Sequence, residues 1–201
     1  MRAAKIQLSK EEKALVKSGQ WILTKNNIIA KIAALFQAMA AQMQQSDCQR
    51  HLGLGQQISQ PKISKGERYQ GLPYVVLDYP REFGKENILA VRTIFWWGNY
   101  FTTTLHLKGI FMESFKPRLM AKQASLAAGN FWLCIDGDEW SQEISTATYR
   151  PILAQGPFLF QEPDSNPAFI KVAAKTDFTH WDHMGEQLLG QWEILMGCLE
   201  A

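Results

Sequence analysis

The clearest hydrophobic and polar pattern in the chain lies at 88–108, with the sequence ILAVRTIFWWGNYFTTTLHLK. Both halves are rich in β-branched and aromatic residues, which pack well on a pleated sheet. Between them lies Gly98-Asn99, a pair that can adopt the positive φ angles of a two-residue hairpin loop. The sequence therefore predicts a long β-hairpin in which Trp97 pairs with Tyr100.

This pairing assigns every residue of the hairpin to a face, because cross-strand partners share a face. One predicted face is mostly apolar and has Arg92 as its only charge, whereas the other is aromatic near the turn and rich in threonine further along. The first comprises Trp96, Phe101, Ile94, Thr103, Arg92, Leu105, Ala90 and Leu107, and the second comprises Trp97, Tyr100, Phe95, Thr102, Thr93, Thr104, Val91 and His106. A slip of one residue in the pairing would regroup them.

Helical patterns occupy both ends of the chain. Ser9 and Glu12 form a capping-box pattern that predicts a short helix to about Lys17, with Gly19 as a left-handed stop. Residues 21–45 follow with apolar side chains at spacings of three, four and seven, which predicts a helix that packs in the core. Its apolar positions are Ile22, Ile28, Ile29, Ile32, Leu35, Phe36, Met39 and Met43. A C-terminal helix from about Thr179 presents Trp181, Met184, Leu188, Trp192, Leu195 and Leu199 on one face.

The remaining patterns are shorter. Strands are predicted at 73–79 (ending at Pro80), 131–135, 144–149 and 169–174, with a helix at 114–128. Residues 46–72 have almost no periodicity and predict a long surface loop. The whole is predicted to be one α+β domain (1–201), with 1–45 as a helical N-terminal arm. Its antiparallel sheet is built around the hairpin, and the N-terminal and C-terminal helices pack on it.

Composition and charge narrow the class of protein. The chain has 201 residues, 46% of them hydrophobic, and a net charge of +2, which gives no electrostatic case for nucleic acid or an anionic membrane. No apolar run is long enough to span a membrane, and the first residues lack the apolar core of a signal peptide. Three widely spaced cysteines do not suggest a disulfide framework. We therefore expect a soluble cytoplasmic protein.

No catalytic or cofactor motif is present, so no cofactor is expected. His180 and His183 have a spacing that could hold a metal. Asp136, Asp138 and Glu139 together resemble the acidic side of a cation site or a general acid–base group. A solvated helix surface explains the histidine pair, and an Asp-Gly-Asp turn explains the acidic group. Cys48-x-x-His51 could be half of a thiol or metal site, but its other half is missing and an ordinary loop explains it. We expect no metal site.

Arg92 and the second hairpin face are the strongest candidates for function. A buried guanidinium needs a partner, which we predict to be Asp78; the functional alternative is that Arg92 binds an anionic ligand. The second face combines aromatic area with directional hydrogen-bonding groups, as ligand pockets do. It could equally be core beneath the C-terminal helix, or a subunit interface. The candidate ligand-binding or interface residues are Arg92, Trp97, Tyr100, Thr102, Thr104 and His106.

The leading hypothesis is a module that binds a small molecule or associates with itself through this face. The alternative is a hydrolase-like or metal-assisted enzyme that uses Asp136 and Asp138 with His106, or with His180 and His183. A homodimer through the helix at 21–45 is a further expectation, because its apolar surface is wider than one contact needs.

Overall fold

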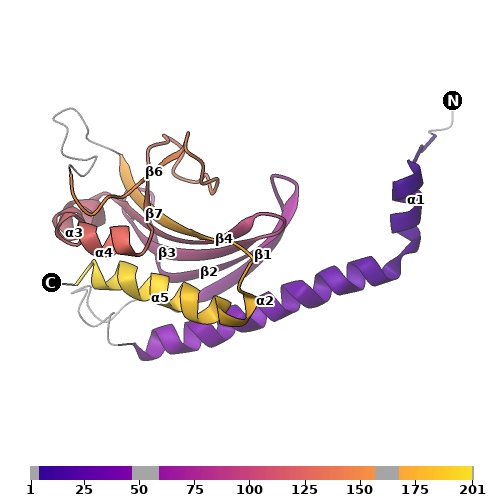
Figure 1. The fold of residues 1–201 in the computed structure, drawn as a ribbon, viewed down its shortest axis with the longest axis horizontal. Coiled ribbons are helices and arrows are strands. Elements are labelled where there is room, and N and C mark those ends of the chain that lie inside the picture. The colour runs from indigo at the N-terminus through magenta and orange to yellow at the C-terminus, as the bar shows by residue number, and fades with distance from the viewer. Residues whose placement is uncertain (1–4, 47–58, 157–167, 201) are drawn as a thin grey trace.

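The computed structural model describes residues 5–46, 59–156 and 168–200, and these form an α+β fold (Figure 1). The helices are α1 (Lys10–Lys17), α2 (Gly19–Gln45), α3 (Ile110–Ala121), α4 (Gln123–Ala128) and α5 (Met184–Gly197), with a 3-10 turn at Trp181–His183. The strands are β1 (Lys62–Tyr69), β2 (Leu72–Phe83), β3 (Ile88–Trp96), β4 (Tyr100–Lys108), β5 (Trp132–Cys134), β6 (Tyr149–Pro151) and β7 (Phe169–Thr176). They make one antiparallel sheet in the order β1-β2-β3-β4-β7-β5-β6. The predicted fold class is confirmed.

The main core lies between the sheet and the helices, with the largest helical share from α2 and α5 and further buried residues from α3 and α4. α5 and the C-terminal half of α2 run side by side beneath one face of the sheet (Figure 1), which we call the inner face. Phe36 and Met43 of α2 are fully buried there, as are Leu188 and Trp192 of α5. The Trp192 indole also donates a hydrogen bond of 2.7 Å to the carbonyl of Tyr79. The opposite face of the sheet, the outer face, carries the candidate site.

The predicted hairpin is present as β3 and β4, but its predicted register is wrong by one residue. Trp96, not Trp97, lies opposite Tyr100. The turn is closed by a hydrogen bond of 3.1 Å from Asn99 N to Trp96 O, with Gly98 at φ +73° inside it. Trp97 N bonds instead to Pro73 O of β2. The loop therefore has three residues, because the positive φ of Gly98 is used one position later in the turn than a Gly98-Asn99 loop requires.

This register regroups the two predicted faces. The inner face takes Phe95, Thr93, Val91 and Leu89 from β3 with Phe101, Thr103, Leu105 and Leu107 from β4. The outer face takes Trp96, Ile94, Arg92, Ala90 and Ile88 with Tyr100, Thr102, Thr104, His106 and Lys108. Arg92 consequently shares a face with the threonines and His106, rather than with the leucines.

Two segments near the first edge of the sheet differ from the sequence prediction. Lys62–Tyr69, within the predicted loop at 46–72, forms the edge strand β1. Its many charged residues conceal the strand pattern, and charged side chains are a usual feature of edge strands; residues 47–58 lie outside the described residues. β2 continues through Pro80 to Phe83, because a register irregularity between Asp78 and Arg81 accommodates the proline.

The helices also differ in detail. The capping box at Ser9 and Glu12 is present, with Glu12 N donating 3.1 Å to Ser9 Oγ. Gly19 begins α2 instead of ending α1 in a left-handed conformation, since the chain turns at Ser18. The helix predicted from Ser114 begins earlier, at Ile110, so that Pro117 lies inside α3. In the described part of the chain, no helix has the length and apolar character needed to cross a membrane.

Candidate ligand-binding site

Charged and polar residues from neighbouring strands meet in rows on the outer face. The register places Lys62, Asp78, Arg92 and Thr104 opposite one another across β1, β2, β3 and β4. His106 of β4 lies opposite Lys171 of β7 in the next row. These rows bring residues that are far apart in the sequence within reach of one another.

A strap (residues 135–148) leaves β5, crosses the outer face and returns to β6. It lies on the opposite side of the sheet from α2 and α5 (Figure 1). Two tyrosine hydroxyls of the sheet accept hydrogen bonds from its backbone: Tyr69 from Gln142 N at 2.8 Å and Tyr100 from Ile144 N at 3.0 Å. The base of the strap is closed by Ile135 N, which donates 2.9 Å to Thr148 O.

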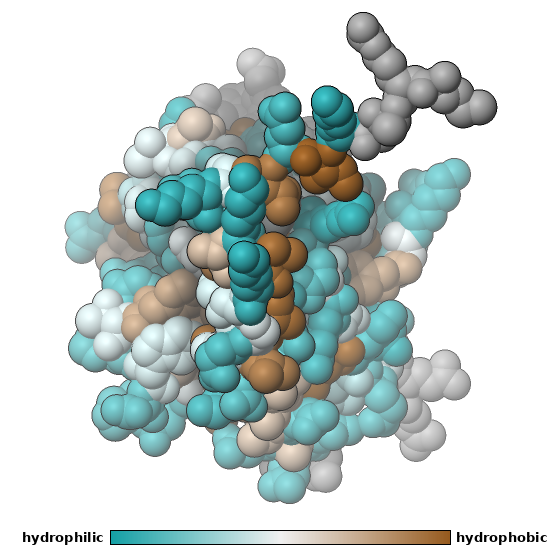
Figure 2. Space-filling model, turned by 90° about the vertical axis from the view of Figure 1, so that its right-hand side faces the viewer, coloured by the Kyte–Doolittle hydropathy of each residue, from teal (hydrophilic) through white to brown (hydrophobic). Residues whose placement is uncertain are grey.

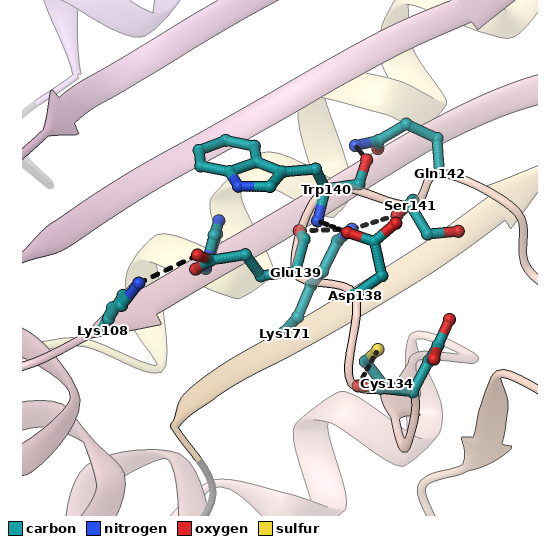
Figure 3. A network of polar contacts seen from close by, with 10 residues as sticks. Lys108, Cys134, Asp138, Glu139, Trp140, Ser141, Gln142 and Lys171 are labelled. Carbon is teal, nitrogen blue, oxygen red and sulfur yellow. Dashed lines mark hydrogen bonds and ion pairs between the residues drawn. The ribbon is translucent and has the colours of Figure 1, made fainter. Parts of the chain in front are cut away.

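Lys171 fastens the strap from below. Its side chain is buried, and its ammonium donates to the carbonyls of Glu139, at 3.1 Å, and Ser141 (Figure 3). Burial lowers the pKa of Lys171 to about 8, because a charged ammonium loses water there. Two backbone carbonyls hold the ammonium. Replacing Lys171 with an apolar residue would leave both carbonyls without this donor.

His106 and Lys108 form a second attachment through one carboxylate. The two oxygens of Glu139 receive Lys108 Nζ at 2.9 Å and His106 Nε2 at 3.1 Å. Burial and the nearby Lys171 ammonium lower the pKa of His106 to about 4, although Glu139 acts in the opposite direction. His106 is therefore neutral at pH 7, with Nε2 as the donor to Glu139.

Arg92 is paired as predicted. Its Nε lies 2.6 Å from Asp78 Oδ1 and its Nη2 lies 3.1 Å from Asp78 Oδ2, a bidentate arrangement. The Asp78 side chain is 8% exposed and that of Arg92 is 25% exposed. The ring of Phe83 lies 5.1 Å from the guanidinium carbon. Arg92 is thus fixed in direction while part of its side chain remains exposed.

Arg92 separates two spaces on the outer face. Beneath Trp140 of the strap is a cavity of about 10 Å³, just large enough for one water molecule. Beside it is an open groove of about 270 Å³. The groove is lined by Lys62, Ser64, Tyr74, Val76, Asp78, Arg81, Phe83 and Arg92. We call it the basic groove, because three of these residues are cationic and only Asp78 is acidic.

Arg81 is held by a backbone carbonyl of the segment that precedes β1. Its Nε donates 2.8 Å to Gln60 O, which leaves the terminal nitrogens of the guanidinium as the part a ligand would meet. Tyr74, Val76 and Phe83 supply apolar and aromatic wall beside these cations. The basic groove can therefore receive an anionic group and an attached apolar group together.

Five of the six candidate residues share the outer face. Tyr100 holds the strap, Thr104 and His106 line the small cavity, and Arg92 lines both spaces. Thr102 is buried, and its hydroxyl has no hydrogen-bond partner among the described residues. Trp97 is the exception, because it lies in the hairpin turn and packs edge-on against Phe95 of the inner face.

The residues of the enzyme alternative come from separate elements: Asp136 and Asp138 lie in the strap, whereas His180 and His183 lie at the 3-10 turn before α5. Asp138 accepts a hydrogen bond of 2.9 Å from Trp140 N, as turn residues do, and it is Glu139 that reaches His106. His183 is exposed at the start of α5, 3.4 Å from Glu186. Among the described residues, no three His, Cys, Asp or Glu side chains come together as a metal site would need. Cys48 and His51 lie outside the described residues.

Three residues of this site were not anticipated from the sequence: Lys62, Glu139 as the partner of His106, and Lys171. Lys171 interrupts the apolar run of β7, and a lone charge in a buried strand is a signal that could have identified it. Lys62 gave no such signal, because only the pairing of β1 with β2 brings it to the row that contains Arg92. Arg81 follows a predicted strand end, which is a common place for site residues.

Comparisons with known proteins do not identify a family for this chain. No protein-family model matches the chain, and neither the curated proteins nor the solved structures contain a match.

Proposed function

We propose that this protein is a binding module that takes a small anionic molecule in the basic groove. The observation that supports this most directly is the convergence of Lys62, Arg81 and Arg92 on a groove whose one carboxylate, Asp78, is already paired. Guanidinium groups bind carboxylates and phosphates through paired hydrogen bonds, which favours a ligand of that chemistry.

The rigidity of Arg92 supports the proposal. A side chain already held in place loses little freedom when a ligand binds, so more of the interaction energy appears as affinity. Asp78 fixes two nitrogens of Arg92, and Phe83 lies against its guanidinium. Arg92, which lines the groove, therefore has a fixed position from which its remaining N–H groups can donate.

The walls of the groove indicate what else the ligand carries. Tyr74, Val76 and Phe83 are apolar or aromatic, and the volume of about 270 Å³ lies slightly below that of a typical ligand pocket. The ligand class we infer is a carboxylate or phosphate joined to one small apolar or aromatic group.

Calorimetric titration with three related probes tests this proposal. Benzoate and phenyl phosphate carry the anion and the ring, and benzyl alcohol carries the ring alone. We expect the two anions to bind and benzyl alcohol to bind at least tenfold more weakly, a difference of about 1.4 kcal/mol. Equal binding of all three probes, or binding of none, would contradict the proposal.

Matched variants locate the binding. Arg81→Gln and Lys62→Gln remove cations that line the groove, and Lys65→Gln removes an exposed cation on the same strand, three residues from Lys62, that does not line it. We expect Arg81→Gln to weaken anion binding about tenfold, since a charge-assisted hydrogen bond contributes about 1.5–3 kcal/mol. Lys62→Gln should weaken it less, because Lys62 is exposed, and Lys65→Gln should leave it unchanged.

A further inference from the structure

The N-terminal end of the chain projects from the body and exposes apolar side chains. Lys25 of α2 pairs with Glu67 of β1 at 2.8 Å, and the chain before it extends past the sheet to α1 (Figure 1). We call residues 5–24 the projecting arm. It holds seven of the thirteen large hydrophobic residues that are exposed in the described part of the chain: Ile6, Leu8, Leu15, Val16, Trp21, Ile22 and Leu23. Figure 2, viewed from the side that carries the arm, shows a run of hydrophobic surface there.

α1 lacks the packing that normally stabilises a short helix. It has eight residues, and none of the described residues of α1 is buried. Isolated helices of this length are not stable in water, and most helical stability in proteins comes from packing an apolar face. The capping box satisfies backbone donors at the start of α1, but Leu15 and Val16 remain 52% and 74% exposed. We therefore expect α1 to be stabilised by packing against another protein surface.

The apolar residues of the arm point in several directions. Trp21, Ile22 and Leu23 are consecutive on α2, so their side chains are spread around the helix, yet they are 50%, 47% and 64% exposed. A flat surface such as a membrane could cover only one side of such a helix. Apolar side chains spread over about 200° of a helix are normally enclosed by more than one protein surface.

We propose that the projecting arms of two copies of this chain pack against each other around a two-fold axis. Each arm supplies two helices, and a second arm, placed antiparallel, encloses α2 on the sides that its own body leaves open. A two-fold contact uses the same surface on both copies, which suits an apolar patch. This inference is independent of the basic groove, since the arm and the groove share no residue.

The charges of α1 favour the antiparallel arrangement. Its first turn carries Glu11 and Glu12 together with Lys10 and Lys13, and its last turn carries Lys17. When two copies of α1 run antiparallel, the Glu11 and Glu12 carboxylates of each lie beside Lys17 of the other. A parallel arrangement would place like charges together.

The exposed apolar surface is of the size that a dimer needs. A standard interface takes about 800 Å² from each partner, and seven large side chains with exposed fractions of 39–88% supply a surface of that order. Trp21 provides the type of residue that most often anchors an interface.

Sedimentation velocity on two leucine variants tests the proposal. Leu23, on the arm, and Leu153, between β6 and the segment at 157–167, are both 64% exposed, so Leu23→Glu and Leu153→Glu place the same charge at sites of equal exposure. We expect the wild type and Leu153→Glu to be dimers at micromolar concentration. Leu23→Glu should raise the dimer dissociation constant at least a hundredfold and keep the melting behaviour of a folded monomer.

A charge exchange tests the antiparallel geometry. In the antiparallel dimer, residue 11 of each copy lies beside residue 17 of the other. Glu11→Lys and Lys17→Glu each turn both of these contacts into like-charge pairs, and each should weaken the dimer about tenfold. Mixed in equal amounts, the two variants should form a heterodimer of wild-type affinity, because both contacts again pair opposite charges. A mixture no tighter than either variant alone would overturn the proposed geometry.

Two further results would overturn the proposal itself. The first is a wild type that remains monomeric at high micromolar concentration. The second is a monomeric wild type that sediments with vesicles of phosphatidylserine and phosphatidylcholine and loses that binding in Leu23→Glu, because the arm would then serve a membrane surface.

Discussion

At the scale of single residues, the outer face is organised by buried or half-buried charges whose partners come from other strands. Lys171 is held by two strap carbonyls, Glu139 by His106 and Lys108, and Arg92 by Asp78. Removing one member of such a pair leaves the other without a partner, and this costs more than the intact pair contributes. The pairs therefore determine how the strap and the groove are positioned.

The Arg92–Asp78 pair makes a direct prediction about stability. Arg92→Met removes the cation but keeps most of the side-chain volume, and we expect it to lower the free energy of unfolding by about 3 kcal/mol. Arg92→Ala should cost more, because it also leaves a cavity. Adding Asp78→Asn to Arg92→Met should recover part of the loss. Denaturant melts of the variants measure this, and an Arg92→Ala protein as stable as the wild type would contradict a structural role for the pair.

His106 predicts a dependence of stability on pH. Its pKa is about 4 in the folded protein and about 6.5 when unfolded, so between these values the unfolded chain binds more protons. The free energy of unfolding should therefore fall as the pH is lowered from 6.5 to 4, by at most about 1.4 kcal/mol per pH unit.

His106→Gln serves as the reference for this pH effect. Carboxylates elsewhere titrate in both proteins, so the relevant quantity is the difference between the two unfolding free energies. We expect this difference to change across pH 4–7.5 and to be constant above about pH 7.5. A difference that is constant over the whole range would show that His106 is not held neutral by its surroundings.

At the scale of elements, the hairpin turn decides which residues meet. The same strands with a two-residue loop would place Arg92 opposite Leu105, whereas the observed three-residue loop places it opposite Thr104. Because side chains alternate between the faces of a strand, a shift of one residue changes the partners of the whole hairpin. The composition of the outer face therefore depends on Gly98 and its neighbours.

Two glycine substitutions test this turn. Gly98 has φ +73°, which side-chain-bearing residues adopt at a cost, whereas Gly137 of the strap has no positive φ and open space around its Cα. We expect Gly98→Ala to lower the free energy of unfolding by about 1 kcal/mol and Gly137→Ala to leave it unchanged or slightly raised. Equal melting temperatures for the two variants would contradict the observed turn.

The helices and strands could be predicted from the sequence better than the register of the strands and the position of the groove. The α+β class, the hairpin, α2 and the pairing of Arg92 with Asp78 could be predicted, because each depends on a local pattern or on the cost of a buried charge. The register could not, since Gly98-Asn99 is compatible with more than one turn. The basic groove could not be foreseen either, because it depends on β1, whose charged edge-strand sequence resembles a loop.

At the scale of the whole molecule, the two faces of the sheet differ in what covers them and in the residues that they carry. α2 and α5 cover the inner face and build the main core, while the outer face is partly covered by the strap and partly open at the basic groove. The core side supplies stability, so the outer side can carry charged residues that a stable core would exclude. This division leaves the basic groove as the place where a small anion would bind.

The most direct test of that claim is a two-dimensional ¹H–¹⁵N NMR titration of the wild type with phenyl phosphate. We expect saturable shifts at the backbone amides of Lys62, Ser64, Arg81 and Arg92, with those of α2 and α5 unmoved. The uncharged benzyl alcohol should produce no such shifts. Saturable shifts centred elsewhere on the molecule, or no saturable shifts with phenyl phosphate, would contradict anion binding in the basic groove.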